Sequence, residues 1–227
     1  MAKDVLELLD HVGWTSERTV HLVGVSMGGM ISLELAKQQP TRFASLTLIS
    51  TAPGRRHRTP IQGVASLARV LGGRILGFDS DSYRLNRLMD TLFPQIWLEE
   101  KCERDPKGRT NRENIYELFA WRYKFNKRQN VHGAMAQIKA ALTHHVSDED
   151  LIRIDSSVPR IAILTGDEDH LVNPRNSEYL RIKLSKATYH HFENTGHAIG
   201  LQHTTRLNQL LIQVFEEGEQ EVRKGGW

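Results

Sequence analysis

The sequence predicts an α/β protein in which a mostly parallel sheet is interrupted by a helical insertion. A strand–helix–strand pattern occupies residues 1–53, and alternating strand and helix patterns return over residues 156–218. Residues 54–155 show helical patterns and no strand pattern. Because a strand–helix–strand order forms a right-handed parallel crossover, we expect the two flanking regions to build one core. Residues 54–155 would then be a helical cap, and residues 219–227 a flexible tail.

Composition and charge narrow the class of protein. Of the 227 residues, 39% are apolar and 25% are charged, which excludes disordered, collagen-like and disulfide-scaffold proteins. The net charge of +3 is too small to indicate nucleic-acid binding. The single cysteine, Cys102, excludes an internal disulfide and a multi-cysteine metal site. Residues 1–20 contain no signal-peptide pattern, so a cytoplasmic location is the default expectation.

The first elements follow from apolar spacing. Apolar residues at helical spacing predict a helix that ends at Gly13. The run Thr19–Val25 is short, apolar and β-branched, which is typical of a strand buried on both faces. A helix follows Ser26 and stops at Pro40, and Ala44–Ser50 is a second buried strand.

The middle of the chain is predicted to be helical. The helical patterns cover residues 61–76, 81–92, 111–125 and 133–142. The basic run at residues 55–58 is expected to be a solvated loop. The stretch from Ile61 to Phe78 contains Arg69 and Arg74, which argues against a membrane-spanning helix and leaves contact with a membrane surface as an alternative. The apolar side chains of the cap either pack it onto the core or line an apolar substrate pocket, and packing is favoured for most of them.

The last part of the chain returns to the α/β pattern. Arg160–Gly166 reads as a strand, a helix begins at Pro174, and residues 187–192 read as another strand. An amphipathic helix is predicted over Thr204–Gly218.

One motif suggests nucleophilic catalysis. Gly24-Val25-Ser26-Met27-Gly28 matches G-x-S-x-G, and it lies between a predicted strand and a predicted helix, as that motif requires. The turn is crowded, so glycine is favoured at Gly24 and Gly28. The backbone N–H of Met27, at the start of the helix, is the predicted donor to an oxyanion. The alternative is a glycine-rich turn that lets the helix pack closely on its strand.

The segment GVSMGGMISLELAKQQPTRFASLTLIS resembles the nucleophile region of the α/β-hydrolase-fold serine hydrolases. The resemblance covers nearly the whole chain and implies the order serine, acid, histidine. It implies Asp169, in Gly166-Asp167-Glu168-Asp169, as the acid and His197, in Thr195-Gly196-His197, as the base. Neighbouring residues of the same types remain as alternatives: Asp167 and Glu168 for the acid, and His190, His191 and His203 for the base.

The resemblance implies an enzyme without a metal or cofactor. Ser26 would attack a small or lipid-like ester, His197 would accept its proton, and Asp169 would orient the imidazole. The expected partner is therefore a small apolar ester and not a nucleic acid. The form S-M-G-G also resembles carbon–carbon bond hydrolases and cofactor-free haloperoxidases. A non-catalytic hydrolase-fold protein that binds a small ligand or a partner is the alternative of a different class.

The resemblance also implies several strands before the nucleophile strand, whereas one predicted helix precedes Thr19 here. We therefore expect a chain that begins partway through the fold, with Thr19–Val25 at the edge of a four-stranded parallel sheet. Such a chain would have one oxyanion donor, weak activity and marginal stability. The apolar side chains of the edge strand should be unusually exposed: Val20, Leu22, Val23 and Val25.

Overall fold

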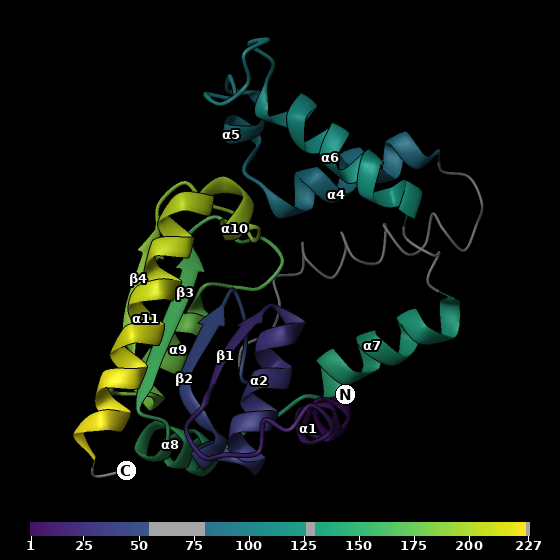
Figure 1. Ribbon diagram of the computed structural model, residues 1–227. Helices are drawn as coiled ribbons and strands as arrows, with labels where there is room; N and C mark the ends of the chain where they lie inside the picture. The colour runs from purple at the N-terminus through teal and green to yellow at the C-terminus, as the bar shows by residue number, and fades with distance from the viewer. Residues whose placement is uncertain (55–79, 126–129, 226–227) are drawn as a thin grey trace.

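A four-stranded parallel sheet forms the centre of the molecule (Figure 1). The computed structural model describes residues 1–54, 80–125 and 130–225. The strands are adjacent in chain order: β1 (Val20–Val25), β2 (Phe43–Ile49), β3 (Arg160–Gly166) and β4 (Thr188–Phe192). This sheet confirms the predicted fold class and places β1 at one edge. The predicted basic loop and the predicted helix over residues 61–76 lie outside the described residues.

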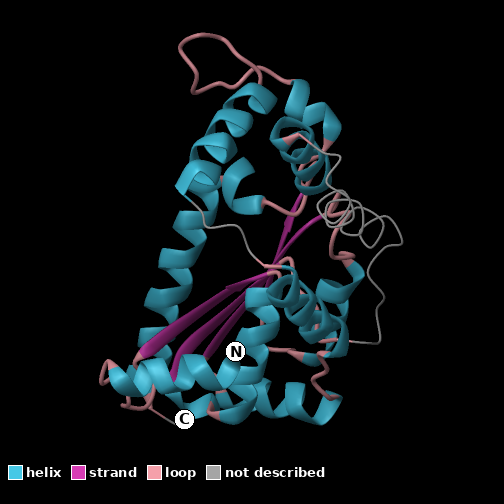
Figure 2. Ribbon diagram, turned by 90° about the vertical axis from the view of Figure 1, so that its right-hand side faces the viewer, coloured by secondary structure: helices cyan, strands magenta, loops and turns pink. Residues whose placement is uncertain are grey.

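Helices cover both faces of the sheet, as the two views in Figures 1 and 2 show. On one face lie α1 (Ala2–His11), α2 (Met27–Gln38), α8 (Asp148–Ser157) and α9 (Arg175–Lys183). The short η1 (Pro40–Arg42) joins α2 to β2. On the other face, α11 (Thr204–Lys224) crosses β2 and β3, preceded by the short α10 (Ile199–Gln202). The molecule therefore has three layers in its core.

The alternation of side chains in β3 explains the two apolar layers. Ile161 and Ile163 belong to the cluster under α2, α8 and α9, whereas Ala162 and Leu164 belong to the cluster under α11. Successive side chains of a strand point to opposite faces, so a continuous apolar run is what a strand covered on both sides requires.

Most of the cap stands beyond the carboxyl ends of the strands, whereas its last helix lies beside α1 and α2 (Figure 1). It contains α4 (Asp81–Leu92), α5 (Gln95–Glu99), α6 (Asn111–Phe125) and α7 (Val131–Thr143). In the described part of residues 54–155, the only pairing of β type consists of two isolated bridges, Gly54 with His145 and Lys101 with Thr110. The interval also contains α8, whose Leu151 and Ile154 are fully buried in the core cluster. The core therefore resumes at α8, before residue 155.

The C-terminal helix is longer than predicted. Gly218 was expected to end it, but α11 continues to Lys224. A Cβ atom at Gly218 would lie 2.9 Å from the carbonyl oxygen of Ala44. The glycine therefore lets α11 pack closely against β2 and does not end the helix. The last turns carry ion pairs between Arg223 and Glu219 and between Lys224 and Glu221. The prediction of a flexible tail from residue 219 is therefore wrong as far as Lys224.

The edge strand is exposed on one face only. Val23 is 37% exposed and Val25 is 49% exposed, and Leu22 is partly buried. Val20 is buried, contrary to expectation, because its side chain belongs to the cluster formed with α1 and α2. The exposure predicted for this strand thus holds for its carboxyl-terminal half.

Candidate active site

Ser26 is the single residue between the end of β1 and the start of α2. Its backbone has φ 55° and ψ −121°, a conformation that side-chain-bearing residues rarely adopt. The Ser26 N–H donates to the carbonyl of Ile49 (2.9 Å), and the Ser26 carbonyl accepts from the N–H of Gly29 (2.9 Å) and of Met30 (3.2 Å). The turn is therefore held by bonds to the next strand and to its own helix.

Two glycines allow α2 to approach the sheet. A Cβ atom at Gly24 would lie 2.6 Å from the Cα of Gly29, and one at Gly29 would lie 2.5 Å from Thr51. Both distances are too short for a real contact. A Cβ atom at Gly28 would meet nothing within 4 Å, so the crowding predicted there is wrong. Of the adjacent Gly28 and Gly29, it is Gly29 that is crowded, because it faces Thr51 in the segment after β2.

The N–H of Met27 is a free donor at this turn. Met27 is the first residue of α2, where helix geometry provides no carbonyl partner. Among the described residues, no acceptor lies within hydrogen-bond distance of this N–H. The positive end of the helix dipole adds to its attraction for negative charge. An oxyanion formed beside Ser26 could therefore accept this hydrogen bond.

Asp169 and His197 form a buried pair. The Nδ1 atom of His197 lies 2.8 Å from Oδ2 of Asp169, and the two residues are 6% and 2% exposed. The other oxygen of Asp169 accepts from the backbone N–H of Leu171 (2.9 Å) and of Val172 (2.8 Å). The carboxylate is thereby fixed, and it favours the tautomer in which Nδ1 carries the proton. The Nε2 atom of His197 is then left as a proton acceptor.

The loop that carries His197 is held from three sides. The N–H of Thr195 donates to Oδ1 of Asp167 (3.0 Å), and the N–H of Gly196 donates to Oε1 of Gln202 (2.8 Å). The N–H of Ala198 donates to the carbonyl of Leu92 in the cap (3.2 Å). The cap and the core thus meet at this loop.

Asp167 supports the loop rather than the imidazole. Burial alone would raise the pKa of Asp167, but the backbone N–H groups of Thr195 and Asn194 outweigh it and lower that pKa. From the sequence, Asp167 was predicted only as an alternative to Asp169. The contact could not be found from spacing, because 28 residues separate Asp167 from Thr195.

The structure brings together two of the three predicted catalytic side chains. Among the described residues, the Ser26 hydroxyl makes no hydrogen bond to His197, contrary to expectation. Ser26 follows β1 at one edge of the sheet, and His197 follows β4 at the other, so the histidine loop has to reach back across β2 and β3. In ligand-free enzymes this bond is commonly long and tightens when substrate binds.

The rival residues have structural partners. His203 Nε2 lies 2.8 Å from the hydroxyl of Thr195, and the N–H of Glu168 donates to the Thr195 carbonyl. His190 and His191 lie within β4. A second serine–histidine contact joins Ser45 Oγ to His21 Nδ1 at 2.8 Å, but Ser45 is fully buried inside β2 and cannot meet a substrate.

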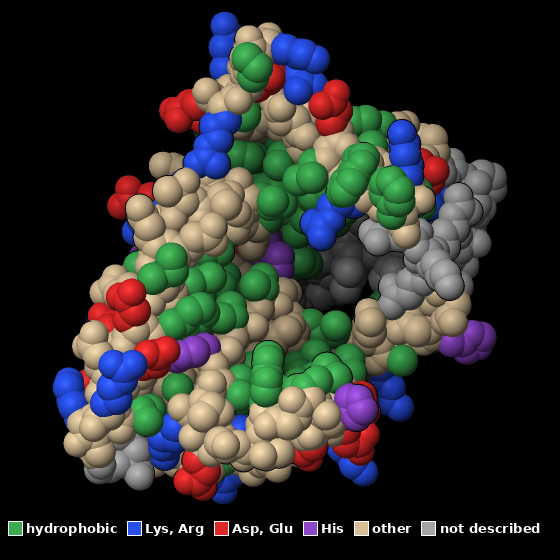
Figure 3. All heavy atoms as spheres, viewed as in Figure 1, with side chains coloured by type: hydrophobic (Ala, Val, Ile, Leu, Met, Phe, Trp, Pro, Cys, Tyr) green, Lys and Arg blue, Asp and Glu red, His purple; other side chains and the backbone are tan. Residues whose placement is uncertain are grey.

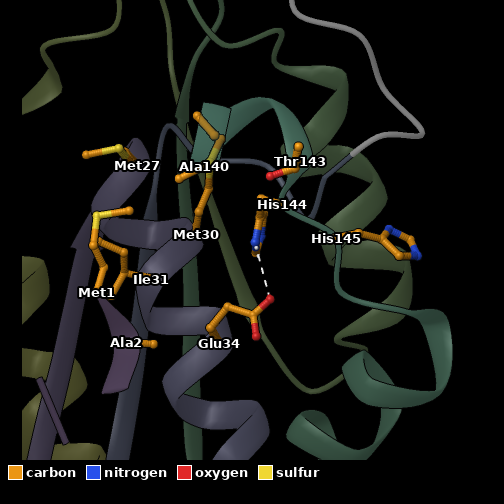
Figure 4. A pocket seen from close by; sticks show the side chains of 11 residues that line it. Met1, Ala2, Met27, Met30, Ile31, Glu34, Ala140, Thr143, His144 and His145 are labelled. Carbon is orange, nitrogen blue, oxygen red and sulfur yellow. Dashed lines mark ion pairs between the residues drawn. The ribbon is translucent and has the colours of Figure 1, made fainter. Parts of the chain in front are cut away.

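Two surface hollows adjoin the cap helices. Figure 3 shows one between the cap helices and the carboxyl edge of the sheet, with hydrophobic side chains on both of its sides. The other is a cavity of about 350 Å³ between α1, α2 and α7, lined by Met27 and Met30 but not by Ser26 or His197 (Figure 4). The first is the one reached from the carboxyl ends of the strands, where an α/β sheet normally binds its ligand.

The second cavity contains a histidine–carboxylate contact of its own. His144 Nδ1 lies 3.4 Å from Oε1 of Glu34, whereas His145 points away from the cavity (Figure 4). Burial lowers the pKa of His144 to about 4, and the nearby charges of His145 and Lys37 add to this effect. His144 is therefore neutral at pH 7.

The part of the chain that the structure describes has neither a cluster of candidate metal ligands nor a helix that could span a membrane. No group of three or more His, Cys, Asp or Glu side chains there could hold a metal ion. No helix in the same residues is long and apolar enough to cross a membrane.

Comparison with known proteins identifies the family. A family model described as "alpha/beta hydrolase fold" matches residues 1–204. The chain belongs to this family. A relative of this α/β hydrolase is the "Putative carbamate hydrolase RutD" of Variovorax paradoxus (strain S110), which is 25% identical over 214 residues, covering 93% of this chain and 70% of RutD.

Solved structures of other hydrolases share the fold. The serine hydrolase CCSP0084 of Cycloclasticus zankles superposes with a TM-score of 0.69 at 22% identity, over 96% of this chain and 70% of that one. The meta-cleavage product hydrolase CumD of Pseudomonas fluorescens IP01 gives a TM-score of 0.66 at 20% identity, over 95% of this chain and 70% of CumD. At these identities the likeness establishes the α/β-hydrolase fold.

Proposed function

We propose that this α/β hydrolase is a serine hydrolase that cleaves a small apolar ester through Ser26, His197 and Asp169. The observation that carries the proposal is the buried Asp169–His197 pair, which follows the carboxyl ends of β3 and β4, as Ser26 in its strained strand–helix turn follows the carboxyl end of β1. A carboxylate that fixes an imidazole, and so leaves its Nε2 atom able to take a proton, is the arrangement by which serine hydrolases activate the serine hydroxyl.

The reaction follows from the positions of these groups. The Oγ atom of Ser26 attacks the ester carbonyl carbon while Nε2 of His197 takes the hydroxyl proton. The carbonyl oxygen becomes an oxyanion, which the N–H of Met27 stabilises. The C–O bond to the alcohol then breaks, and His197 returns the proton to the departing alkoxide. Water repeats the sequence on the acyl-enzyme and releases the acid and free Ser26.

Apolar side chains support the choice of an apolar substrate. Residues of the cap form a cluster with two residues from the segment after His197: Met89, Phe93, Leu98 and Ile115 with Ala198 and Leu201. This cluster places apolar surface next to the catalytic loop. The carbamate hydrolase named above makes aryl carbamates a reasonable second substrate to test, since they undergo the same acyl transfer.

A fluorophosphonate probe tests the proposal. The folded chain should be labelled at Ser26, and labelling should disappear in Ser26→Ala and in heat-denatured protein. Ser16→Ala is the matched control, because the exposed Ser16 precedes β1 whereas Ser26 follows it. The same variants should show parallel losses in hydrolysis of p-nitrophenyl butyrate. Labelling and hydrolysis that persist in Ser26→Ala would contradict the proposal, as would the absence of both in the folded wild type.

A further inference from the structure

We propose that Thr51 is a positioning residue that aims the oxyanion donor, the backbone N–H of Met27. Thr51 is 1% exposed and lies just beyond β2, next to the Ser26 turn. Its hydroxyl donates to the carbonyl oxygen of Ser26 at 2.7 Å. The inference rests on the proposed function, because it assigns Thr51 a part in the reaction at Ser26.

The link from Thr51 to Met27 runs through one peptide unit. The carbonyl of Ser26 and the N–H of Met27 belong to the same planar trans peptide, in which C=O and N–H point in opposite directions. A hydrogen bond that fixes the direction of the Ser26 carbonyl therefore also fixes the direction of the Met27 N–H. The N–H groups of Gly29 and Met30 pull the same carbonyl toward α2. Thr51 supplies the donor that comes from outside the helix.

The fit between Thr51 and α2 depends on Gly29. A Cβ atom at Gly29 would lie 2.5 Å from the Cβ and Oγ1 atoms of Thr51, so only glycine lets the threonine come this close. Thr51 is also held in place from the other side, because β2 precedes it and the carbonyl of Pro53 accepts from the N–H of Val146 (2.8 Å). The hydroxyl is thus presented from a fixed position.

Fixing this peptide matters because Ser26 is strained. A residue at φ 55° and ψ −121° holds that conformation only where its surroundings over-determine it. Without the Thr51 hydroxyl, the Ser26–Met27 peptide can rotate, and its N–H then points less well at the developing oxyanion. Removal of a whole oxyanion donor costs about 10²–10³ in kcat. Misalignment of the donor is expected to lower kcat roughly 10-fold, with KM unchanged within about twofold.

Three variants test this role. Thr51→Val removes the hydroxyl and keeps the shape, whereas Thr51→Ser keeps the hydroxyl. Thr47→Val is the matched control, because Thr47 is a fully buried threonine of β2 whose hydroxyl has no hydrogen-bond partner in the described structure. We expect kcat for p-nitrophenyl butyrate to fall about 10-fold in Thr51→Val alone. If Thr51→Val does not fold, Thr51→Ala is compared with Thr51→Ser in its place.

The outcomes separate this inference from the proposed function. Equal kcat in Thr51→Val and Thr47→Val overturns the positioning role, and an equal fall in Thr51→Ser and Thr51→Val assigns the effect to packing and also overturns it. Amide hydrogen exchange at Gly29 and Met30 gives a second reading that needs no catalysis. Exchange there should be faster in Thr51→Val than in Thr51→Ser and Thr47→Val. If Ser26 proves not to be a nucleophile, the proposed function fails, and the part of Thr51 in the reaction fails with it. Faster amide exchange in Thr51→Val would then show only that the Thr51 hydroxyl stabilises the turn at Ser26.

Discussion

The three side chains assigned to catalysis differ in how firmly they are held. Asp169 has three hydrogen-bond donors, two of them backbone N–H groups, and His197 is buried beside it. The Ser26 side chain has no such partner among the described residues, although its backbone is fixed on both sides. The proposed acid and base are thus pre-organised, whereas the proposed nucleophile has a hydroxyl that we expect substrate binding to bring to His197.

The two neighbouring aspartates should be separable by substitution. Asp169→Asn is expected to lower kcat by about 10³–10⁴, because an amide favours the wrong imidazole tautomer. Asp167→Asn weakens one support of the loop, so its loss should be about 10-fold or less. Steady-state kinetics on an ester decides between them. The opposite ranking would assign the acid to Asp167.

His144 should make stability depend on pH. Its folded pKa of about 4 lies below the unfolded value of 6.5, so its contribution is complete above pH 6.5 and is lost as the pH falls toward 4. Between pH 7 and pH 5 this linkage amounts to roughly 2 kcal/mol. Urea unfolding of wild type and His144→Gln at both pH values measures it. A variant that loses as much stability as wild type would remove His144 as the cause.

At the scale of elements, the prediction was most accurate for strands. All four strands begin and end within about a residue of the predicted runs. For β2 and β3 the reason is that strands buried on both faces need unbroken apolar sequence. Helices shorter than two turns, α5 and α10, carry too few residues for a periodic pattern, and α8 was missed as well. The end of α11 was misjudged because glycine has two uses, as a helix stop and as a point of close approach.

At Gly218 the glycine allows close approach to β2 and does not stop the helix. Alanine normally stabilises a helix interior by about 1 kcal/mol over glycine. At Gly218, however, the added Cβ would press on the carbonyl of Ala44, and we expect Gly218→Ala to lower the melting temperature by several degrees. Gln220→Ala, at an exposed position of the same helix, should leave it nearly unchanged. Thermal unfolding followed by circular dichroism measures both, and a gain in stability for Gly218→Ala would show that α11 can move away from β2.

The sequence pointed to the proposed catalytic residues but not to the residues that support them. Ser26, Asp169 and His197 could be proposed because a short motif and the chain order of a known family mark them. The support given by Asp167 and Thr51 was not found. Each of these side chains bonds to a backbone atom more than 20 residues away, and such contacts leave no periodic signal in sequence.

At the scale of the whole molecule, the exposed half of β1 should govern self-association. Val23 and Val25 lie on the same face of an edge strand, an arrangement that favours pairing with another chain. Val23→Lys is expected to slow concentration-dependent aggregation severalfold, as measured by light scattering. Ile212→Lys, at an exposed apolar site on α11, should slow it less. Equal effects would show that general surface hydrophobicity, and not the strand edge, drives association.

The cap leaves the core and returns to it at one place. Gly54 and His145 form an antiparallel bridge, and the N–H of Val146 donates to the carbonyl of Pro53 at 2.8 Å. Gly54 has φ 122°, and a Cβ atom there would collide with the backbone of His144. Only glycine therefore fits at this point of the chain. Two strands at this separation can be joined by a turn of about two to four residues. If such a turn joins Gly54 to His145 in place of the cap, we expect the core chain to keep its path, whereas the contacts between the cap and the segment around His197 are lost.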